Sequence, residues 1–137
     1  MGAVERGGRD SVKEEFEVKV EITVRLTRQD IDDIMVAALE GGIDYWCFKA
    51  EVVGEYLGEY ASEQISRGGM LKLYDIETGE KYWLDRDKFL KGFKLWLEND
   101  GDQYGAVEDG EVDCCNIDAG CADEIVQYAL FGEVIYG

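Results

Sequence analysis

Residues 16–26 carry the most regular pattern in this chain. Charged or polar side chains alternate with apolar ones. The apolar residues, at every second position, are Phe16, Val18, Val20, Ile22, Val24 and Leu26. Such alternation is typical of a β-strand with one buried face, because successive side chains point to opposite sides. The segment is longer than the usual strand of about five or six residues. We therefore expect it to bend, to form one arm of a hairpin or to pair across a subunit boundary.

Three later segments have the pattern of capped helices. Thr27, Asp85 and Asp118 each precede apolar residues at helical spacing, and their side chains can accept hydrogen bonds from first-turn N–H groups. We expect one helix from Thr27 to the glycines at 41–42 and a second from Asp85 to residue 99. A third should run from Asp118 to residue 130 or 131, where Gly132 stops it.

The middle of the chain predicts a β-hairpin. Strands are expected at 70–74 and 81–84 around a tight turn at 77–80, and a last short strand at 134–136. Residues 43–48 fit either a short buried strand or the start of a helix. Residues 49–69 are expected to be mostly loop with a short strand or helical turn, and 99–117 an acidic loop.

These elements predict an α+β fold, with a small antiparallel sheet, a long N-terminal strand and about three helices. The 137 residues, of which 46% are hydrophobic, suffice for one core and not for two. We expect a flexible tail at 1–13 and a single domain over 14–137. No apolar run is long enough to cross a bilayer, and the first 15 residues lack the apolar core of a signal peptide. A cytoplasmic protein is expected.

Charge is distributed unevenly along the chain. There are 14 basic and 31 acidic residues, a net charge of −17, and residues 95–137 contain 11 of the acidic residues and none of the basic ones. We therefore expect no binding to free nucleic acid or to an anionic membrane. The acidic C-terminal third either imitates nucleic acid and occupies a basic groove of another protein, or is a solvated surface that favours solubility or adaptation to salt.

The residues used most often in catalysis and metal binding are scarce or poorly spaced. The chain has no histidine, which excludes Ser-His and Cys-His nucleophile pairs. Cys47, Cys114, Cys115 and Cys121 lack zinc-site spacing and are expected to be free thiols. The acidic residues of 98–113 do not match a calcium-binding loop. We expect a protein that is not an enzyme and has no cofactor or metal.

Two groups of residues are candidates for ligand contacts. Arg67 offers a planar donor fork beside Gly68, where a ligand can approach the backbone closely, although a simple turn before the strand at 70–74 explains the same residues. Aromatic residues, among them Tyr45, Trp46 and Phe93, can stack on a base, although core packing is the commoner role. Together with lysines such as Lys91, they could form a site for a small anionic nucleotide.

Several segments resemble a known family of phage proteins. These are ALEGGIDYWC (38–47), EYLGEYASEQISRGGMLKLYD (55–75), DKFLKGFKLWL (87–97) and DAGCADEIVQYALFGEVIYG (118–137). They are similar to the Thoeris anti-defence sponges of the first type and also resemble a group of type II-A anti-CRISPR proteins. The resemblance runs from about Leu26 to the end of the chain.

The resemblance implies a protein that sequesters cyclic ADP-ribose isomers, and in some members cyclic oligonucleotides, without cleaving them. It further implies dimers or hexamers in the cytoplasm of a host bacterium, with binding sites near subunit interfaces. By the same resemblance Arg67, Gly68, Lys91 and Phe93 would contact phosphates and bases, with Tyr45 and Trp46 as weaker candidates. One departure is the absence of a basic residue in the C-terminal helix.

Overall fold

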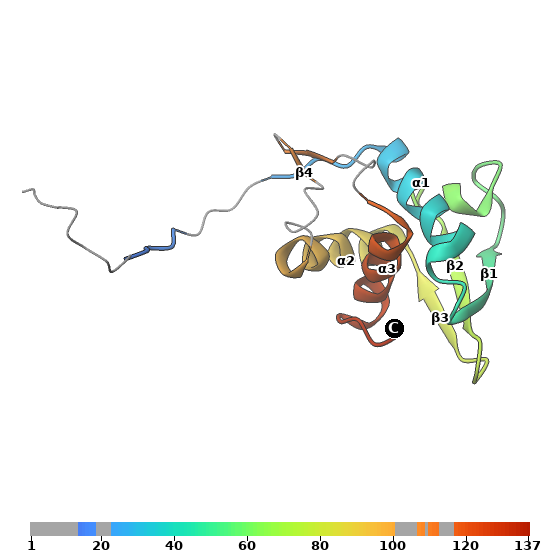
Figure 1. The fold of residues 1–137 in the computed structure, drawn as a ribbon. Coiled ribbons are helices and arrows are strands. Elements are labelled where there is room, and N and C mark those ends of the chain that lie inside the picture. The colour runs from blue at the N-terminus through green and yellow to red at the C-terminus, as the bar shows by residue number, and fades with distance from the viewer. Residues whose placement is uncertain (1–13, 19–22, 101–106, 109, 113–116) are drawn as a thin grey trace, which may run out of the picture.

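The computed structural model describes residues 14–18, 23–100, 107–108, 110–112 and 117–137. Over these residues the fold is α+β, as the sequence predicts, with three α-helices and a three-stranded antiparallel sheet (Figure 1). The expected tail at 1–13 and the middle of the expected N-terminal strand lie outside the described residues.

The three-stranded sheet has the order β1-β2-β3, with β1 at Cys47–Val53, β2 at Met70–Asp75 and β3 at Lys81–Leu84. The β2–β3 hairpin confirms the expected strands and turn. β1 places a short strand, which was expected somewhere in 49–69, at residues 49–53, and 43–46 form a turn before it. The aromatic run here was ambiguous because a short apolar segment fits a strand or a helix, and pairing with β2 decides between them.

The three α-helices confirm the expected caps. Thr27 and Asp30 form a reciprocal capping box at the start of α1 (Arg28–Ala37), which continues into the π-helical turn η1 (Ala38–Gly42). Asp85 caps α2 (Arg86–Asn99) and Asp118 caps α3 (Ala119–Phe131), each through its carboxylate. At the end of α3, Gly132 adopts a left-handed conformation with φ of 75°, which glycine tolerates best.

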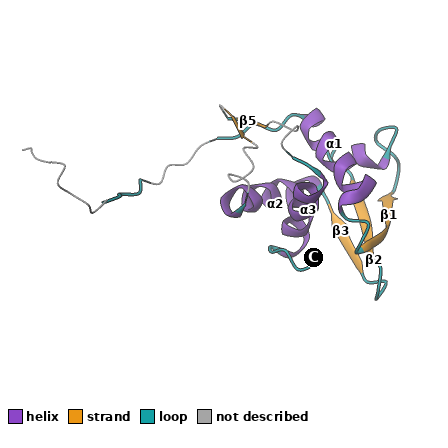
Figure 2. Ribbon diagram, in the orientation of Figure 1, coloured by secondary structure: helices purple, strands orange, loops and turns teal. Residues whose placement is uncertain are grey.

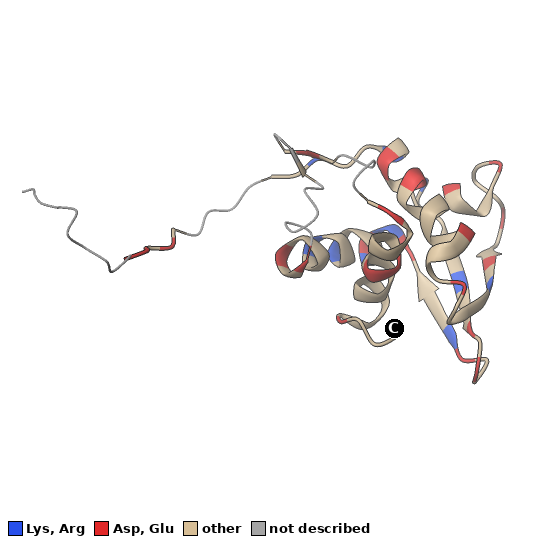
Figure 3. Cartoon of the chain, in the orientation of Figure 1, with Lys and Arg blue, Asp and Glu red and all other residues tan. Residues whose placement is uncertain are grey.

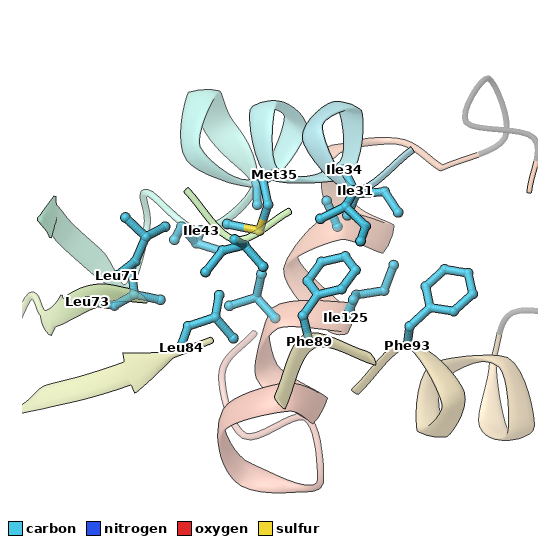
Figure 4. Packing of buried hydrophobic residues seen from close by; sticks show 14 of the residues in the cluster. Ile31, Ile34, Met35, Ile43, Leu71, Leu73, Leu84, Phe89, Phe93 and Ile125 are labelled. Carbon is cyan, nitrogen blue, oxygen red and sulfur yellow. The ribbon is translucent and has the colours of Figure 1, made fainter. Parts of the chain in front are cut away.

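The buried side chains form one cluster between the helices and the inner face of the sheet (Figure 4). Ile34 and Met35 of α1 point toward Phe89 of α2 and Ile125 of α3, and the sheet contributes leucines, all of them buried: Leu71, Leu73 and Leu84. The helices gather on one side of the sheet (Figure 2). The sheet therefore has one face against the core and one face without a helix.

The expected strand at 134–136 does not form, and the one expected at 16–26 lies partly outside the described residues. Phe16 and Val18 are 83% exposed, and the described residues of 16–26 make an isolated bridge between Arg25 and Glu111. Alternation alone does not supply the partner that backbone groups of a strand need. Pairing across a subunit boundary stays a prediction. Residues 134–136 are not a strand, since their backbone N–H groups bond to a side chain of α3 instead of another strand.

Two further short elements lie in segments expected to be mostly loop. The helical turn expected somewhere in 49–69 is a 3₁₀ turn, η2 (Ala61–Glu63), next to α1. Within the expected acidic loop, β4 (Val107–Glu108) and β5 (Glu111–Val112) form a minimal antiparallel hairpin. The rest of 101–116, including Cys114 and Cys115, lies outside the described residues.

Candidate functional site

A surface hollow of about 460 Å³ lies where the start of α3 meets the turn before β1 and the C-terminal segment. Three acidic side chains and two tyrosines supply its polar lining: Asp118, Asp123, Glu124, Tyr45 and Tyr136. The rest of the lining is Gly120, Cys121, Val134 and Gly137. This volume falls in the range of small-ligand sites, so the charge of the walls decides what the hollow can bind.

Asp123 is the acidic residue in the wall with three side-chain hydrogen bonds. The residue is 7% exposed, and its carboxylate accepts hydrogen bonds from Tyr45 Oη (2.7 Å), Trp46 Nε1 (2.8 Å) and Gln127 Nε2 (2.9 Å). All three donors are neutral groups. In the described part of the chain no lysine or arginine forms an ion pair with Asp123. The negative charge at this wall is therefore stabilised by dipoles and not cancelled.

Glu124 lies beside Asp123 in a field of other carboxylates. It accepts a hydrogen bond from Trp96 Nε1 at 3.0 Å. Partial burial raises the pKa of Glu124, and the charges of Asp100, Asp123 and Asp118 raise it further. Burial and a hydrogen bond to Asp100 also raise the pKa of Tyr128 to about 12. These shifts indicate an electrostatic environment that disfavours additional negative charge.

The far wall of the hollow is the C-terminal segment, which Gln127 holds in place. The side chain of Gln127 is fully buried, and its Oε1 accepts from the backbone N–H groups of Ile135 and Tyr136, both at 2.8 Å. Tyr136 stacks on Trp46 with ring centroids 4.7 Å apart and donates its hydroxyl to Asp75. The wall is thus fixed by buried contacts, so the hollow exists before any ligand binds.

We call Asp100, Asp118, Asp123 and Glu124 the acidic face. Figure 3 shows acidic residues at the start of α3 and basic residues on the strands of the sheet. A concave surface with uncompensated carboxylates and tyrosine rings attracts a cationic group, such as a guanidinium or an ammonium, and repels phosphate. Burial raises the pKa of the Cys121 thiol to about 11, so this thiol is protonated near neutral pH.

The six residues that sequence analysis selected for ligand binding are not brought into one pocket. Of these, only Tyr45 lines the hollow. Its hydroxyl donates a hydrogen bond to Asp123. Burial of Tyr45 and this hydrogen bond raise the pKa of Tyr45 to about 12. Trp46 is 2% exposed and Phe93 is 3% exposed. Because both rings pack in the core, neither is available to stack on a base in this conformation.

The other three selected residues lie elsewhere. Arg67 is partly buried, and its Nη1 lies 3.8 Å from Asp32 Oδ2, so this cation has an acidic neighbour. Gly68 is exposed in a left-handed turn with φ of 88°, and Lys91 is exposed on α2. Their roles as phosphate contacts stay predictions.

Sequence analysis missed the residues that form the acidic face. The C-terminal acidic excess pointed to this region, and Asp118 was identified as a cap. No local signal distinguishes Asp123 and Glu124 from the many other acidic residues. Their importance arises from neighbours far apart in sequence, such as Tyr45 and Trp96. Only the packing of α3 against α2 and the turn before β1 brings these groups together.

No protein family, curated protein or solved structure matches this chain. The resemblance of its segments to the anti-defence sponges therefore stays a prediction. Within the described residues, no helix combines the length and the apolar character needed to cross a membrane. Nor do these residues contain a group of three or more carboxylate or cysteine ligands arranged to hold a metal ion.

Proposed function

We propose that this protein is a binding protein that uses its acidic face to dock into a basic groove of a nucleic-acid-handling protein. The observation that carries the proposal is the hollow lined by Asp118, Asp123 and Glu124, in which Asp123 accepts hydrogen bonds from neutral donors and the neighbouring carboxylates repel one another. A cationic side chain placed in the hollow relieves this repulsion. The basic residue of the docked partner would then donate charge-assisted hydrogen bonds to these carboxylates. It otherwise donates such bonds to the phosphates of its nucleic acid.

The distribution of charge supports the same function. Residues 95–137 contain no basic residue, so the acidic face has no lysine or arginine within its own segment. A net charge of −17 also accelerates encounter with a basic partner at low salt. The fixed walls of the hollow reduce the ordering cost of docking. Inhibition of a nuclease by occupation of its groove is the corresponding activity.

The test is a cleavage assay with a panel of nucleases that hold DNA in a basic groove, beginning with RNA-guided nucleases. We expect cleavage of labelled DNA by a susceptible nuclease to fall as protein is added, and the bound protein to be displaced by excess DNA or by salt. The double variant Asp118→Asn with Glu124→Gln keeps the cap and an acceptor for Trp96 but removes two charges. It should bind about tenfold more weakly, or about 1.4 kcal/mol.

The matched control removes two charges at a distance from the acidic face. Glu40→Gln with Glu59→Gln has the same net charge as the test variant, and both side chains are exposed. This control should inhibit like the unmodified protein. If both double variants lose inhibition equally, net charge and not the acidic face determines binding, and the proposal fails. It fails also if no nuclease in the panel is inhibited.

We propose nucleotide sequestration as the second candidate, because one part of the structure favours an anion. Nη1 of Arg67 is buried and makes no hydrogen bond within the described residues. The guanidinium of Arg86 lies 3.8 Å from where a Cβ on the exposed Gly68 would stand. A phosphate beside Gly68 could accept hydrogen bonds from this guanidinium. The protein would then act as a sponge for a cyclic nucleotide signal, as the sequence resemblance implies.

Depletion of ligand from solution tests this second function. The protein is incubated with cyclic ADP-ribose isomers and cyclic oligonucleotides, removed by filtration, and heat-denatured, and ligand is measured by chromatography at each stage. A sponge should deplete one ligand and release it unchanged, and Arg86→Gln should weaken depletion while Lys94→Gln should not. A ligand released in altered form indicates an enzyme. If no ligand is depleted at micromolar protein, sequestration is excluded for this panel.

A further inference from the structure

The outer face of the sheet differs in charge from the rest of the molecule. Leu71 and Leu73 of β2 point into the core, so Lys72 and Tyr74, which alternate with them, belong to the opposite face. Neighbouring residues of β1 and β3 extend this surface, and no helix of the described residues covers it (Figure 2). We call it the sheet platform and define it by six residues: Phe48, Lys49, Lys72, Tyr74, Lys81 and Trp83.

Three lysines converge on one aromatic ring in the sheet platform. The ammonium groups of Lys49, Lys72 and Lys81 lie 5.3, 5.8 and 5.9 Å from the centroid of the Tyr74 ring. Lys72 also lies 5.8 Å from the Trp83 ring. Each distance is within the range of a cation–π contact. A chain of net charge −17 has thus placed three of its 14 basic residues around a single tyrosine.

Glu51 only partly balances these cations. Its carboxylate accepts a hydrogen bond from the hydroxyl of Tyr74 at 2.8 Å. Carboxylate oxygens of Glu51 also lie 3.4 Å from Lys49 Nζ and 3.7 Å from Lys72 Nζ. The hydrogen bond from Tyr74 and the neighbouring lysines lower the pKa of Glu51, so it stays ionised. Within the described part of the chain Lys81 forms no ion pair. The platform therefore has a local positive excess.

The aromatic rings of the platform are accessible. Phe48 is 57% exposed and Trp83 is 43% exposed, unlike Trp46 and Trp96, which are buried. One ring comes from each strand, and Phe48 lies 5.7 Å from Tyr74 between ring centroids. Adjacent strands are about 4.8 Å apart. Exposing large rings to water has a cost that a stacked ligand removes.

We propose that the sheet platform binds a short segment of single-stranded nucleic acid. Bases stack on the exposed rings of Phe48 and Trp83, and the phosphates between them lie against the lysines. Aromatic side chains on an open sheet, with basic residues beside them, are the combination that single-strand recognition requires, because every base has a π-face and every nucleotide a phosphate.

The arrangement favours a strand over other anionic partners. A mononucleotide engages one ring and one or two lysines, whereas the platform offers rings on separate strands and three cations. A duplex is a poorer match, since its base faces are already stacked. The net charge of the protein opposes any polyanion at long range. At physiological salt the Debye length is about 8 Å, however, so the local cations dominate at contact distance.

This inference departs from the expectation that the protein does not bind free nucleic acid. That expectation used the charge averaged over the chain, and the fold concentrates lysines on one face. The inference is also independent of the acidic face, which lies on α2 and α3. Either can fail without the other, because the variants that test them are on different elements.

Fluorescence anisotropy with labelled ten-nucleotide single strands of deoxythymidine, deoxyadenosine and uridine tests the proposal on the full chain. We expect binding near physiological salt, with log affinity falling against log salt above it at a slope near −2, as three phosphate contacts at about −0.7 each imply. Trp83→Ala should weaken binding by about fivefold to 150-fold, the range for loss of one stacked base. Lys49→Gln with Lys81→Gln should reduce the salt slope.

Matched controls use exposed residues outside the platform. Tyr60→Ala removes an aromatic ring that is 62% exposed, and Arg28→Gln with Lys94→Gln removes two exposed basic residues, one from α1 and one from α2. These variants should bind the strands like the unmodified protein, and circular dichroism should show that every variant is folded. Equal losses in the platform and control variants overturn the proposal, as does the absence of binding to all three strands at tens of micromolar protein.

Two further outcomes would overturn the proposal in favour of another occupant. A mononucleotide and an unlabelled decamer are each used to displace the labelled strand. If both displace it at the same concentration, the platform recognises a nucleotide and not a strand. If sedimentation shows a dimer that Trp83→Ala dissociates, a second copy of the chain covers this face.

Discussion

At the scale of single residues, buried carboxylates with neutral donors organise this protein. Asp123 holds Tyr45, Trp46 and Gln127, and Asp75 holds the turn before β3 and the hydroxyl of Tyr136. Such hydrogen bonds are stronger than those between neutral groups. Glu124 is different, because its neighbours are themselves acidic, and its ionised form is disfavoured in the folded state.

Glu124→Gln should therefore stabilise the protein at neutral pH. Its raised pKa means that the folded state binds the proton more tightly than the unfolded state does, so ionisation above about pH 4.3 costs stability. Glutamine removes the charge and keeps an acceptor for Trp96. We expect a melting temperature a few degrees higher than that of the unmodified protein at pH 7, and no difference near pH 4. A variant that is less stable at pH 7 contradicts this prediction.

Asp75→Asn should destabilise the protein, with the opposite dependence on pH. Hydrogen bonds from Tyr136 and from backbone N–H groups lower the pKa of Asp75 to about 2. Its stabilising contribution is present above the ordinary value of 3.8 and is lost as the pH falls toward 2. The difference in melting temperature between the two proteins should be clear at pH 7 and shrink below pH 3. A difference that is constant with pH assigns the effect to packing alone.

At the scale of elements, α2 and α3 pack closely enough to need a glycine. A Cβ on Gly92 of α2 would lie 2.5 Å from the backbone N of Ala129 in α3. No such atom fits without separating the helices. This close contact brings Trp96 within hydrogen-bond distance of Glu124, and so it also shapes the acidic face.

Gly92→Ala should destabilise the protein by about 1–3 kcal/mol, the usual cost of overpacking, despite a helix propensity that favours alanine by about 1 kcal/mol. Gly120→Ala in the first turn of α3 is the matched control, since its added Cβ would meet only Asp118 Oδ1, at 3.4 Å. Urea unfolding should show a loss for the first variant and no change or a small gain for the second. Similar values for both would exclude the close contact as the cause.

At the scale of the whole molecule, the fold gathers residues of like charge on separate surfaces. The acidic face lies on α2 and α3, and three lysines gather on the sheet platform. Most acidic residues remain uncompensated, with a net charge of −17. Self-repulsion of this kind opposes the compact state.

Added salt should therefore stabilise the protein. The Debye length falls from about 30 Å at 0.01 M to about 3 Å at 1 M salt, which screens repulsion between exposed carboxylates. We expect the melting temperature at pH 7 to rise by several degrees over the first part of this range, as measured by circular dichroism. The rise should be much smaller at pH 4, where many carboxylates are protonated. A midpoint that does not change with sodium chloride at pH 7 contradicts this prediction.

Local chemistry explains the elements that sequence analysis predicted correctly. The three helices begin at Thr27, Asp85 and Asp118 because a short polar side chain satisfies N–H groups of the first turn. The β2–β3 hairpin follows from alternation around a tight turn. The expected strand at 134–136 did not form because a strand also needs a partner, which no local pattern supplies. The strand expected at 16–26 stays a prediction, since its middle lies outside the described residues.

The sequence by itself determined the α+β class, the caps and turns, and the acidic excess of the C-terminal third, because each depends on neighbouring residues or on composition. Tertiary structure decided which aromatic side chains are buried and which charged groups lie close together. It buried Trp46 and Phe93 and left Trp83 exposed, and it placed Glu124 among carboxylates and Lys72 among lysines. Burial and electrostatic environment depend on contacts between residues far apart in the chain, and these contacts exist only once the chain has folded.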